Sequence, residues 1–165
     1  MVPDIYWLPE PPERLLAIVA RPRPGDSLPD EIEGWNRAGL RVIVSLLEPA
    51  EVAAMGLLDE AKLCTSAGIE FVSFPVPDFG LPPSIESLLA LTESLAGHIR
   101  RDRAVGIHCR GSIGRSGVVT SCVLVCLGYD AENALALTSG ARGVSVPETR
   151  EQRDYVMSFR PTRRR

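Results

Sequence analysis

The chain has 165 residues and a formal charge of −3, with 18 Lys and Arg against 21 Asp and Glu. Apolar residues make up 45% and charged residues 24%, a composition typical of one soluble globular domain with a single core. The slightly acidic balance does not favour a nucleic-acid partner. No apolar stretch is long enough to span a membrane, and the N-terminus lacks the pattern of a secretion signal.

No internal repeat, low-complexity block or linker divides the chain, so we predict a single domain over residues 1–165. Its last residues, 161–165, form a basic tail that we expect to be disordered. The spacing of the four cysteines does not resemble that of a small disulfide-linked domain, which favours reduced thiols and a cytoplasmic location. Cys122 and Cys126 are predicted to be core residues, because two further ligands for a metal ion are missing.

Short apolar runs alternate along the chain with longer segments of helical periodicity. Prolines surround the first two runs, which are therefore predicted to be strands at a sheet edge. In chain order the predicted elements are strands 5–8 and 15–19, helix 29–38, strand 41–46, helical segment 50–67 with a break near Gly56, strand 69–74, helix 84–100, strand 104–108 and helices 115–127, 131–142 and 148–159.

Dense apolar strands alternating with helices predict an α/β fold. We expect a central, mainly parallel sheet of about four or five strands, flanked by helices. In such folds ligands bind beyond the carboxyl ends of the strands. The segment that follows strand 104–108 lies at such an end, so it is the leading candidate for a functional site.

This segment has the composition of a phosphate-binding loop between a strand and a helix. Cys109 follows the strand, five residues come next, and Arg115 opens the helix. A short loop over a helix N-terminus directs several backbone N–H groups at one point, where they and the helix dipole attract an anion. Gly111 and Gly114 permit close approach of the backbone, and the Arg115 guanidinium can hold two phosphate oxygens. In this positive potential Cys109 is expected to be largely thiolate, and therefore a nucleophile toward phosphorus.

The run His108-Cys109, five residues, Arg115-Ser116-Gly117 resembles the CX5R signature of the cysteine-dependent protein tyrosine and dual-specificity phosphatases. The resemblance extends to Pro77-Asp78, which is similar to the mobile acid loop of that family. It also includes Val146-Pro147-Glu148-Thr149 with Gln152, which is similar to a helix start in the compact members. Ser45-Leu46-Leu47-Glu48 further resembles small bacterial phosphatases.

The resemblance implies a role for each matching residue. Cys109 would form a phosphocysteine intermediate, and Arg115 would bind the phosphoryl oxygens into the transition state. Asp78 would protonate the leaving oxygen and then activate water. Ser116 would donate a hydrogen bond to the Cys109 sulfur, and His108 would orient the loop.

The remaining loop residues complete the implied substrate site. The expected substrate-binding set is Arg110, Gly111, Ser112, Ile113, Gly114 and Arg115, mainly through backbone amides. Gln152 could position water for the second step, or it could cap the last helix. The resemblance implies no metal and no other cofactor, because Arg115 and the amides supply the positive charge.

Ser112 departs from the family pattern, since that position is usually glycine. If the position needs a positive φ, a serine there is strained by about 1 kcal/mol or more. The departure concerns the shape of the loop and removes no catalytic group.

The leading hypothesis is a metal-independent protein tyrosine phosphatase with additional dual specificity, acting on a phosphorylated protein or peptide. Apolar Ile113 favours a protein substrate over a phosphoinositide, because phosphoinositide phosphatases tend to have lysines at this place and at Arg110. The alternatives are a phosphoprotein-binding module with little turnover and a phosphatase for lipids or small molecules. A sulfur transferase or arsenate reductase is a weaker alternative, because Asp78 precedes Cys109. Cys64 could form a regulatory disulfide with Cys109.

Overall fold

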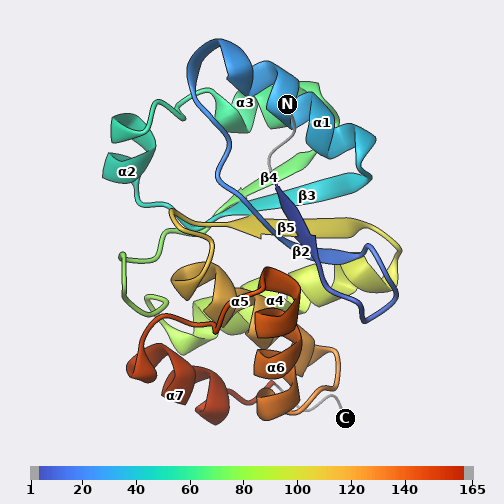
Figure 1. Cartoon of the computed structure of the whole chain (residues 1–165), viewed down its shortest axis with the longest axis vertical. Coiled ribbons are helices and arrows are strands. Elements are labelled where there is room, and N and C mark those ends of the chain that lie inside the picture. Colours follow the sequence, from blue (N-terminus) through green and yellow to red (C-terminus); the bar gives the residue numbers. More distant parts are fainter. Residues whose placement is uncertain (1–3, 162–165) are drawn as a thin grey trace.

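The computed structural model describes residues 4–161. A five-stranded sheet has the strand order β1-β2-β5-β3-β4, and helices cover both of its faces (Figure 1). The elements are β1 (Ile5–Trp7), β2 (Leu16–Val19), the 3-10 turn η1 (Gly25–Ser27), α1 (Leu28–Arg37), β3 (Leu40–Ser45), α2 (Pro49–Ala54), α3 (Glu60–Ser66), β4 (Glu70–Ser73), α4 (Ile85–Arg100), β5 (Ala104–His108), α5 (Gly114–Cys126), α6 (Ala131–Arg142) and α7 (Arg150–Ser158).

The sheet is mainly parallel, as predicted. Strands β2, β5, β3 and β4 run parallel to one another, and only β1 pairs in the antiparallel sense. The prediction that both N-terminal strands lie at the edge is wrong for β2. This strand lies between β1 and β5 and all four of its residues are buried, because its apolar side chains pack on both faces of the sheet.

Two apolar clusters fill the space between the sheet and its helices. Helices α1 and α3 cover one face, with Trp35, Leu40 and Cys64 among the buried residues. Helices α4, α5, α6 and α7 lie on the other face (Figure 1). The predicted apolar side of α4 belongs to this second cluster and is buried, at Leu88, Leu91, Leu95 and Ile99.

Most predicted boundaries are confirmed to within two residues. The helical segment 50–67 divides into α2 and α3, and Gly56 between them has a φ of +68°. Helix α7 begins at Arg150, later than predicted, because Thr149 forms its N-cap in a capping box with Gln152. The predicted tail at 161–165 lies outside the described residues except for Pro161.

Helix α5 follows β5 after the loop 109–113 and passes through the larger cluster. Every residue from Gly114 to Val125 is buried, including Cys122, while Cys126 is half-buried. This burial anchors the loop between β5 and α5 from below. Among residues 4–161, no helix combines the length and apolarity needed to cross a membrane.

Candidate active site

The loop from Cys109 to Ile113 connects β5 to α5 at the carboxyl end of the sheet. Cys109 is 2% exposed and lies at the base of the loop. Ile113 occupies the N-cap position of α5 but gives no side-chain hydrogen bond to the helix. The first N–H groups of an α-helix have no partner within it. Apart from the Gly114 amide, which donates to Glu148, the start of α5 therefore retains donors and the positive dipole end that an anion requires.

Arg115 is buried, yet its guanidinium reaches acceptors from several segments. Nη1 and Nη2 donate to the two Glu51 carboxylate oxygens at 2.7 and 2.9 Å. Nη1 also donates to the Val76 carbonyl at 2.8 Å and, more weakly, to that of Leu46 at 3.4 Å. These bonds hold the guanidinium plane at the first turn of α5.

The predicted acid, Asp78, lies beside this arginine. Its Oδ1 is 3.2 Å from Arg115 Nη2, and its side chain is 37% exposed. The acid loop turns sharply after Asp78, since the Gly80 amide donates to the Pro77 carbonyl at 2.8 Å. Phe79, at the corner of this turn, is 62% exposed. The fold thus brings residue 78 and residue 115 together, as the resemblance implies.

Glu51 and Arg115 affect each other's titration. The hydrogen bond from Arg115 holds the pKa of Glu51 below its usual value, and the Arg110 charge contributes further. Burial lowers the pKa of Arg115, but the Glu51 hydrogen bond and the nearby Cys109 and Asp78 charges outweigh it and raise that pKa overall. Arg115 is therefore a permanent cation at this site.

His108 is fully buried at the end of β5 and contacts a carboxylate from the other face of the sheet. Its Nε2 lies 2.6 Å from Glu60 Oε1, and Glu60 is buried as well. The Trp35 ring stacks on the imidazole at a centroid distance of 6.2 Å. Glu60 is therefore the residue that holds the His108 ring in place, and the role of His108 in orienting the loop stays a prediction.

Ser112 has a φ of +57°, so the position does require the left-handed backbone. Its hydroxyl donates to the Val19 carbonyl at 2.7 Å, and its own carbonyl accepts from Arg142 Nε at 3.1 Å. Both bonds tie the loop to neighbouring elements. The serine thus has a structural reason to occupy a conformation that glycine adopts more easily.

The other predicted loop residues differ in exposure. Arg110 and Gly111 are exposed, and Ile113 is half-buried. The Gly114 amide donates to Glu148 Oε1 at 3.1 Å. Ser116 is fully buried, and among the described residues its hydroxyl has no hydrogen-bond partner. The hydrogen bond to the Cys109 sulfur that the resemblance implies is therefore not formed in this structure.

Gln152 is fully buried, and its carboxamide is already engaged. Oε1 accepts from the backbone amides of Glu148 and Thr149 at 3.1 and 3.2 Å. Nε2 donates to the Gly80 carbonyl at 3.1 Å. The residue caps its helix and also contacts the acid loop.

Three carboxylates in and near the site were not predicted. Glu51, Glu60 and Glu148 come from α2, α3 and the segment before α7. Glu51 has a local signal, because Glu48 and Glu51 form a capping box around the start of α2, and Glu148 lies within the 146–149 motif noted above. The contact of Glu51 with Arg115 joins residues 64 positions apart and has no trace in the sequence.

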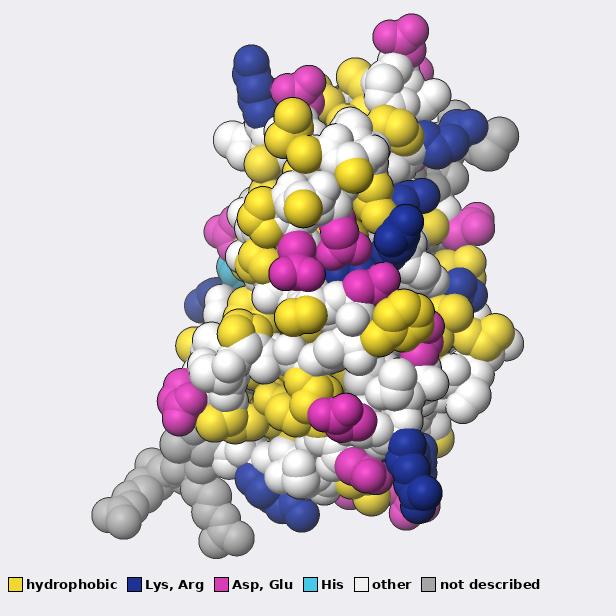
Figure 2. Space-filling model, turned by 90° about the vertical axis from the view of Figure 1, so that its left-hand side faces the viewer, with side chains coloured by type: hydrophobic (Ala, Val, Ile, Leu, Met, Phe, Trp, Pro, Cys, Tyr) yellow, Lys and Arg dark blue, Asp and Glu magenta, His cyan; other side chains and the backbone are white. Residues whose placement is uncertain are grey.

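The face that carries the site is the left-hand side of Figure 1, where α2, the loop after β4 and α7 lie. Figure 2 shows that acidic side chains gather near the middle of this face, next to basic ones. Among residues 4–161, no group of three or more His, Cys, Asp or Glu side chains is arranged to hold a metal ion.

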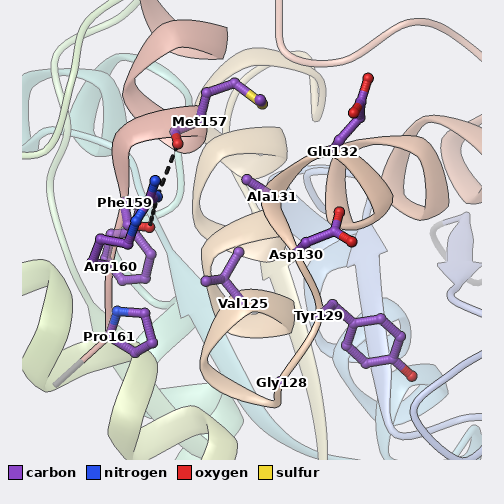
Figure 3. A pocket seen from close by; sticks show the side chains of 10 residues that line it. All are labelled: Val125, Gly128, Tyr129, Asp130, Ala131, Glu132, Met157, Phe159, Arg160 and Pro161. Atoms are coloured by element: carbon purple, nitrogen blue, oxygen red, sulfur yellow. Dashed lines mark hydrogen bonds between the residues drawn. The ribbon is translucent and has the colours of Figure 1, made fainter. Parts of the chain in front are cut away.

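A separate cavity of about 560 Å³ lies between the end of α5, the start of α6 and the end of α7 (Figure 3). Its lining includes Val125, Phe159 and Pro161. Arg160 in its wall donates to the Met157 carbonyl at 3.0 Å. Ten helical residues separate Val125 from Arg115, about 15 Å at 1.5 Å per residue, so this cavity is distinct from the phosphate loop.

Comparison with known proteins identifies the family. Residues 19–129 match the family described as "Polymorphic toxin system, DSP-PTPase phosphatase". This match includes η1 to α5, and with them the acid loop and the complete phosphate loop. The chain belongs to the dual-specificity phosphatase superfamily.

Relatives in this superfamily are moderately similar in sequence. Cyclin-dependent kinase inhibitor 3 of Homo sapiens is 33% identical over 133 residues, covering 79% of this chain and 61% of the relative. Protein tyrosine phosphatase domain-containing protein 1 of Danio rerio is 27% identical over 154 residues, 86% of this chain and 21% of the relative. The chain therefore spans less than two thirds of the length of these relatives.

Solved structures share the fold. Kinase associated phosphatase, crystallised with its catalytic cysteine replaced by serine, superposes with a TM-score of 0.85 at 24% identity, covering 96% of this chain and 94% of that one. The active form of Tk-PTP has a TM-score of 0.74 at 26% identity and 95% coverage of both chains. The family's α/β architecture is thus present over nearly the whole chain.

Proposed function

We propose that the protein is a metal-independent phosphomonoester hydrolase that acts on phosphorylated proteins through a phosphocysteine intermediate. The observation that carries the proposal is the convergence of Cys109, Arg115 and Asp78 at the carboxyl end of the sheet, with Asp78 only 3.2 Å from the arginine. A nucleophile, an oxyanion clamp and a proton donor are the groups that this reaction needs. Membership of the dual-specificity phosphatase superfamily supports the same reaction.

In the first step the Cys109 thiolate attacks phosphorus, and the bond from phosphorus to the ester oxygen breaks. Asp78 donates its proton to that leaving oxygen, while Arg115 and the loop amides bind the other phosphoryl oxygens. In the second step water attacks phosphorus and gives its proton to the Asp78 carboxylate. The phosphorus–sulfur bond then breaks, helped by a hydrogen bond from Ser116 to the departing sulfur, and inorganic phosphate leaves.

Phosphotyrosine is the proposed first substrate, with phosphoserine and phosphothreonine as further ones. The exposed Phe79 ring adjoins the proposed acid, and half-buried Ile113 provides apolar surface in the loop. Both suit contact with an aromatic ring. We further propose a cytoplasmic location, in keeping with four cysteines that are all free.

Hydrolysis of p-nitrophenyl phosphate in the presence of a chelator tests the reaction. We expect turnover that survives chelation, is lost in Cys109→Ser, and falls about 10²- to 10⁴-fold in Asp78→Asn. Asp102→Asn is a matched control, because Asp102 is an exposed acid at a positive φ that asparagine tolerates. Oxyanion binding without turnover by the unmodified protein would refute the enzyme and favour a phosphoprotein-binding module.

A parallel panel tests the substrate class. Phosphotyrosine, phosphoserine and phosphothreonine peptides and phosphoinositide vesicles are compared by kcat/KM. We expect the phosphotyrosine peptides to be hydrolysed fastest. A preference for the vesicles would contradict a protein substrate and support the lipid alternative.

A further inference from the structure

The carboxamide of Gln152 lies where three segments of the proposed active site meet. Its oxygen accepts from two amides at the start of α7, and its nitrogen donates to the Gly80 carbonyl in the acid loop. It also packs against the phosphate loop: a Cβ atom at Gly114 would lie 3.1 Å from Gln152 Oε1 and 3.3 Å from Nε2. A side chain with no solvent exposure thus joins residues 80, 114 and 149.

The bond to Gly80 bears directly on where Asp78 lies. The turn from Pro77 to Gly80 is tight, because the Gly80 amide bonds to the Pro77 carbonyl and a Cβ at Gly80 would lie 2.9 Å from that same oxygen. Holding the Gly80 carbonyl therefore holds the Asp78 backbone two residues earlier. The Asp78 carboxylate itself accepts a hydrogen bond from the Phe79 amide at 3.1 Å and forms an ion pair with Arg115.

The hydrogen bond from Gln152 to Gly80 and the ion pair between Asp78 and Arg115 differ in how they depend on charge. A general acid must be protonated when it acts, and a neutral Asp78 no longer forms an ion pair with Arg115. A substrate phosphoryl group also competes for the same guanidinium. The hydrogen bond from Gln152 to the Gly80 carbonyl joins two neutral groups, so it persists in the reactive form of the site.

We propose, on the basis of the function proposed above, that Gln152 is a positioning residue that holds the acid loop over the phosphate loop for the first chemical step. The carboxamide oxygen already accepts two hydrogen bonds, and one of the two amide hydrogens is used on Gly80. That engagement favours a role in proton donation to the leaving group over one in positioning the water of the second step.

The dependence of kcat/KM on the leaving group tests this inference. This parameter reports the steps up to release of the alcohol, so it senses proton donation and not the later attack of water. We expect Gln152→Met to lose about tenfold more activity on phenyl phosphate, whose leaving group needs a proton, than on 2,4-dinitrophenyl phosphate, whose leaving group does not. Asp78→Asn should show the same pattern with a larger amplitude.

Two control variants distinguish an effect on the acid loop from an effect on the stability of α7. Thr149→Ala removes the N-cap hydroxyl but keeps Gln152, and Arg153→Ala changes an exposed side chain on the same helix. Neither should alter the selectivity between the two esters. Gly80→Ala disturbs the same contact from the acid loop. We expect this variant to show the same difference in activity between the two esters as Gln152→Met. The inference can therefore still be tested if Gln152→Met does not fold.

Three results would overturn the inference. Equal losses on both esters in Gln152→Met or Gly80→Ala would mean that the residue only stabilises the fold. An unchanged kcat/KM with a burst of released phenol would place Gln152 in the second step. A protein that hydrolyses neither ester refutes the proposed function and this inference with it.

Discussion

At the scale of single residues, Ser112 combines a strained backbone with a hydrogen bond that ties the loop to β2. Its positive φ disfavours any side chain with a Cβ, while its hydroxyl gives the buried Val19 carbonyl a partner at 2.7 Å. The two effects have opposite signs and are each about 1 kcal/mol. The usual glycine is therefore replaced at little net cost.

Comparing Ser112→Ala with Ser112→Gly separates these effects. Both variants lose the hydroxyl, and only alanine keeps the strain of the left-handed backbone. We expect the glycine variant to be more stable than the alanine variant by roughly 1 kcal/mol, measured by urea unfolding. An alanine variant as stable as the glycine variant would show that the strain is negligible.

Glu51 gives a second prediction at this scale, through pH. Its hydrogen bonds with Arg115 lower its pKa from the usual 4.5, so its contribution to stability is full above pH 4.5 and is lost as the pH falls through the lowered pKa. Glu51→Gln should cost about 1–3 kcal/mol at pH 7, and this deficit should shrink below pH 4.5.

Urea unfolding at several pH values checks this prediction. The matched control is Glu33→Gln, which changes an exposed carboxylate on α1 and should have little effect at any pH. A deficit for Glu51→Gln that stays constant down to pH 3 would contradict the proposed ion pair with Arg115.

At the scale of elements, β5 and α5 hold the groups proposed to bind phosphate, because both elements are packed on every side. All of β5 is buried, and no face of α5 is exposed to solvent from Gly114 to Val125. Gly106 in the middle of β5 leaves room for side chains of the neighbouring strands β2 and β3. A Cβ there would lie 3.0 Å from Ile43 Cδ1 and from Val19 Cγ1.

We therefore expect Gly106→Ala to destabilise the protein by about 1–3 kcal/mol through overpacking. Gly140→Ala is the matched control, because Gly140 lies in exposed α6 with no atom within 4 Å of an added Cβ. Alanine should stabilise that helix by about 0.5–1 kcal/mol. Thermal and urea unfolding measure both changes, and a neutral Gly106→Ala would show that the core can yield around β5.

At the scale of the whole molecule, the sheet separates two cores and with them the cysteines. Cys109 belongs to the cluster with α4 to α7, whereas Cys64 belongs to that with α1 and α3. Burial, with a smaller effect of the Glu60 charge, raises the pKa of the Cys64 thiol to about 12. A buried thiol of this kind reacts slowly with oxidants.

We accordingly expect no Cys64–Cys109 disulfide after treatment with peroxide. Mass spectrometry of the non-reduced protein checks this, and Cys64→Ser should be inactivated by peroxide at the same rate as the unmodified protein. A disulfide between the two, or a changed rate in Cys64→Ser, would support the regulatory pairing considered from the sequence.

The sequence by itself determined the α/β class, the order of the elements and the loop from Cys109 to Arg115. These follow from apolar periodicity and from residues adjacent along the chain, so local physical chemistry is sufficient to predict them. The resemblance marked Ser112 as strained if its position needs a positive φ, and the structure gives it a φ of +57°.

Only the tertiary structure decided which groups surround that loop. The partners of Arg115, His108 and Gly114 are Glu51, Glu60 and Glu148, and each pair is separated by more than thirty residues. An isolated carboxylate has the same appearance in a sequence whether it faces solvent or a buried cation. The crossovers of the parallel sheet and the packing of the last helices bring these distant residues together, whereas Asp78 is distinguished in the sequence by its resemblance to a family motif.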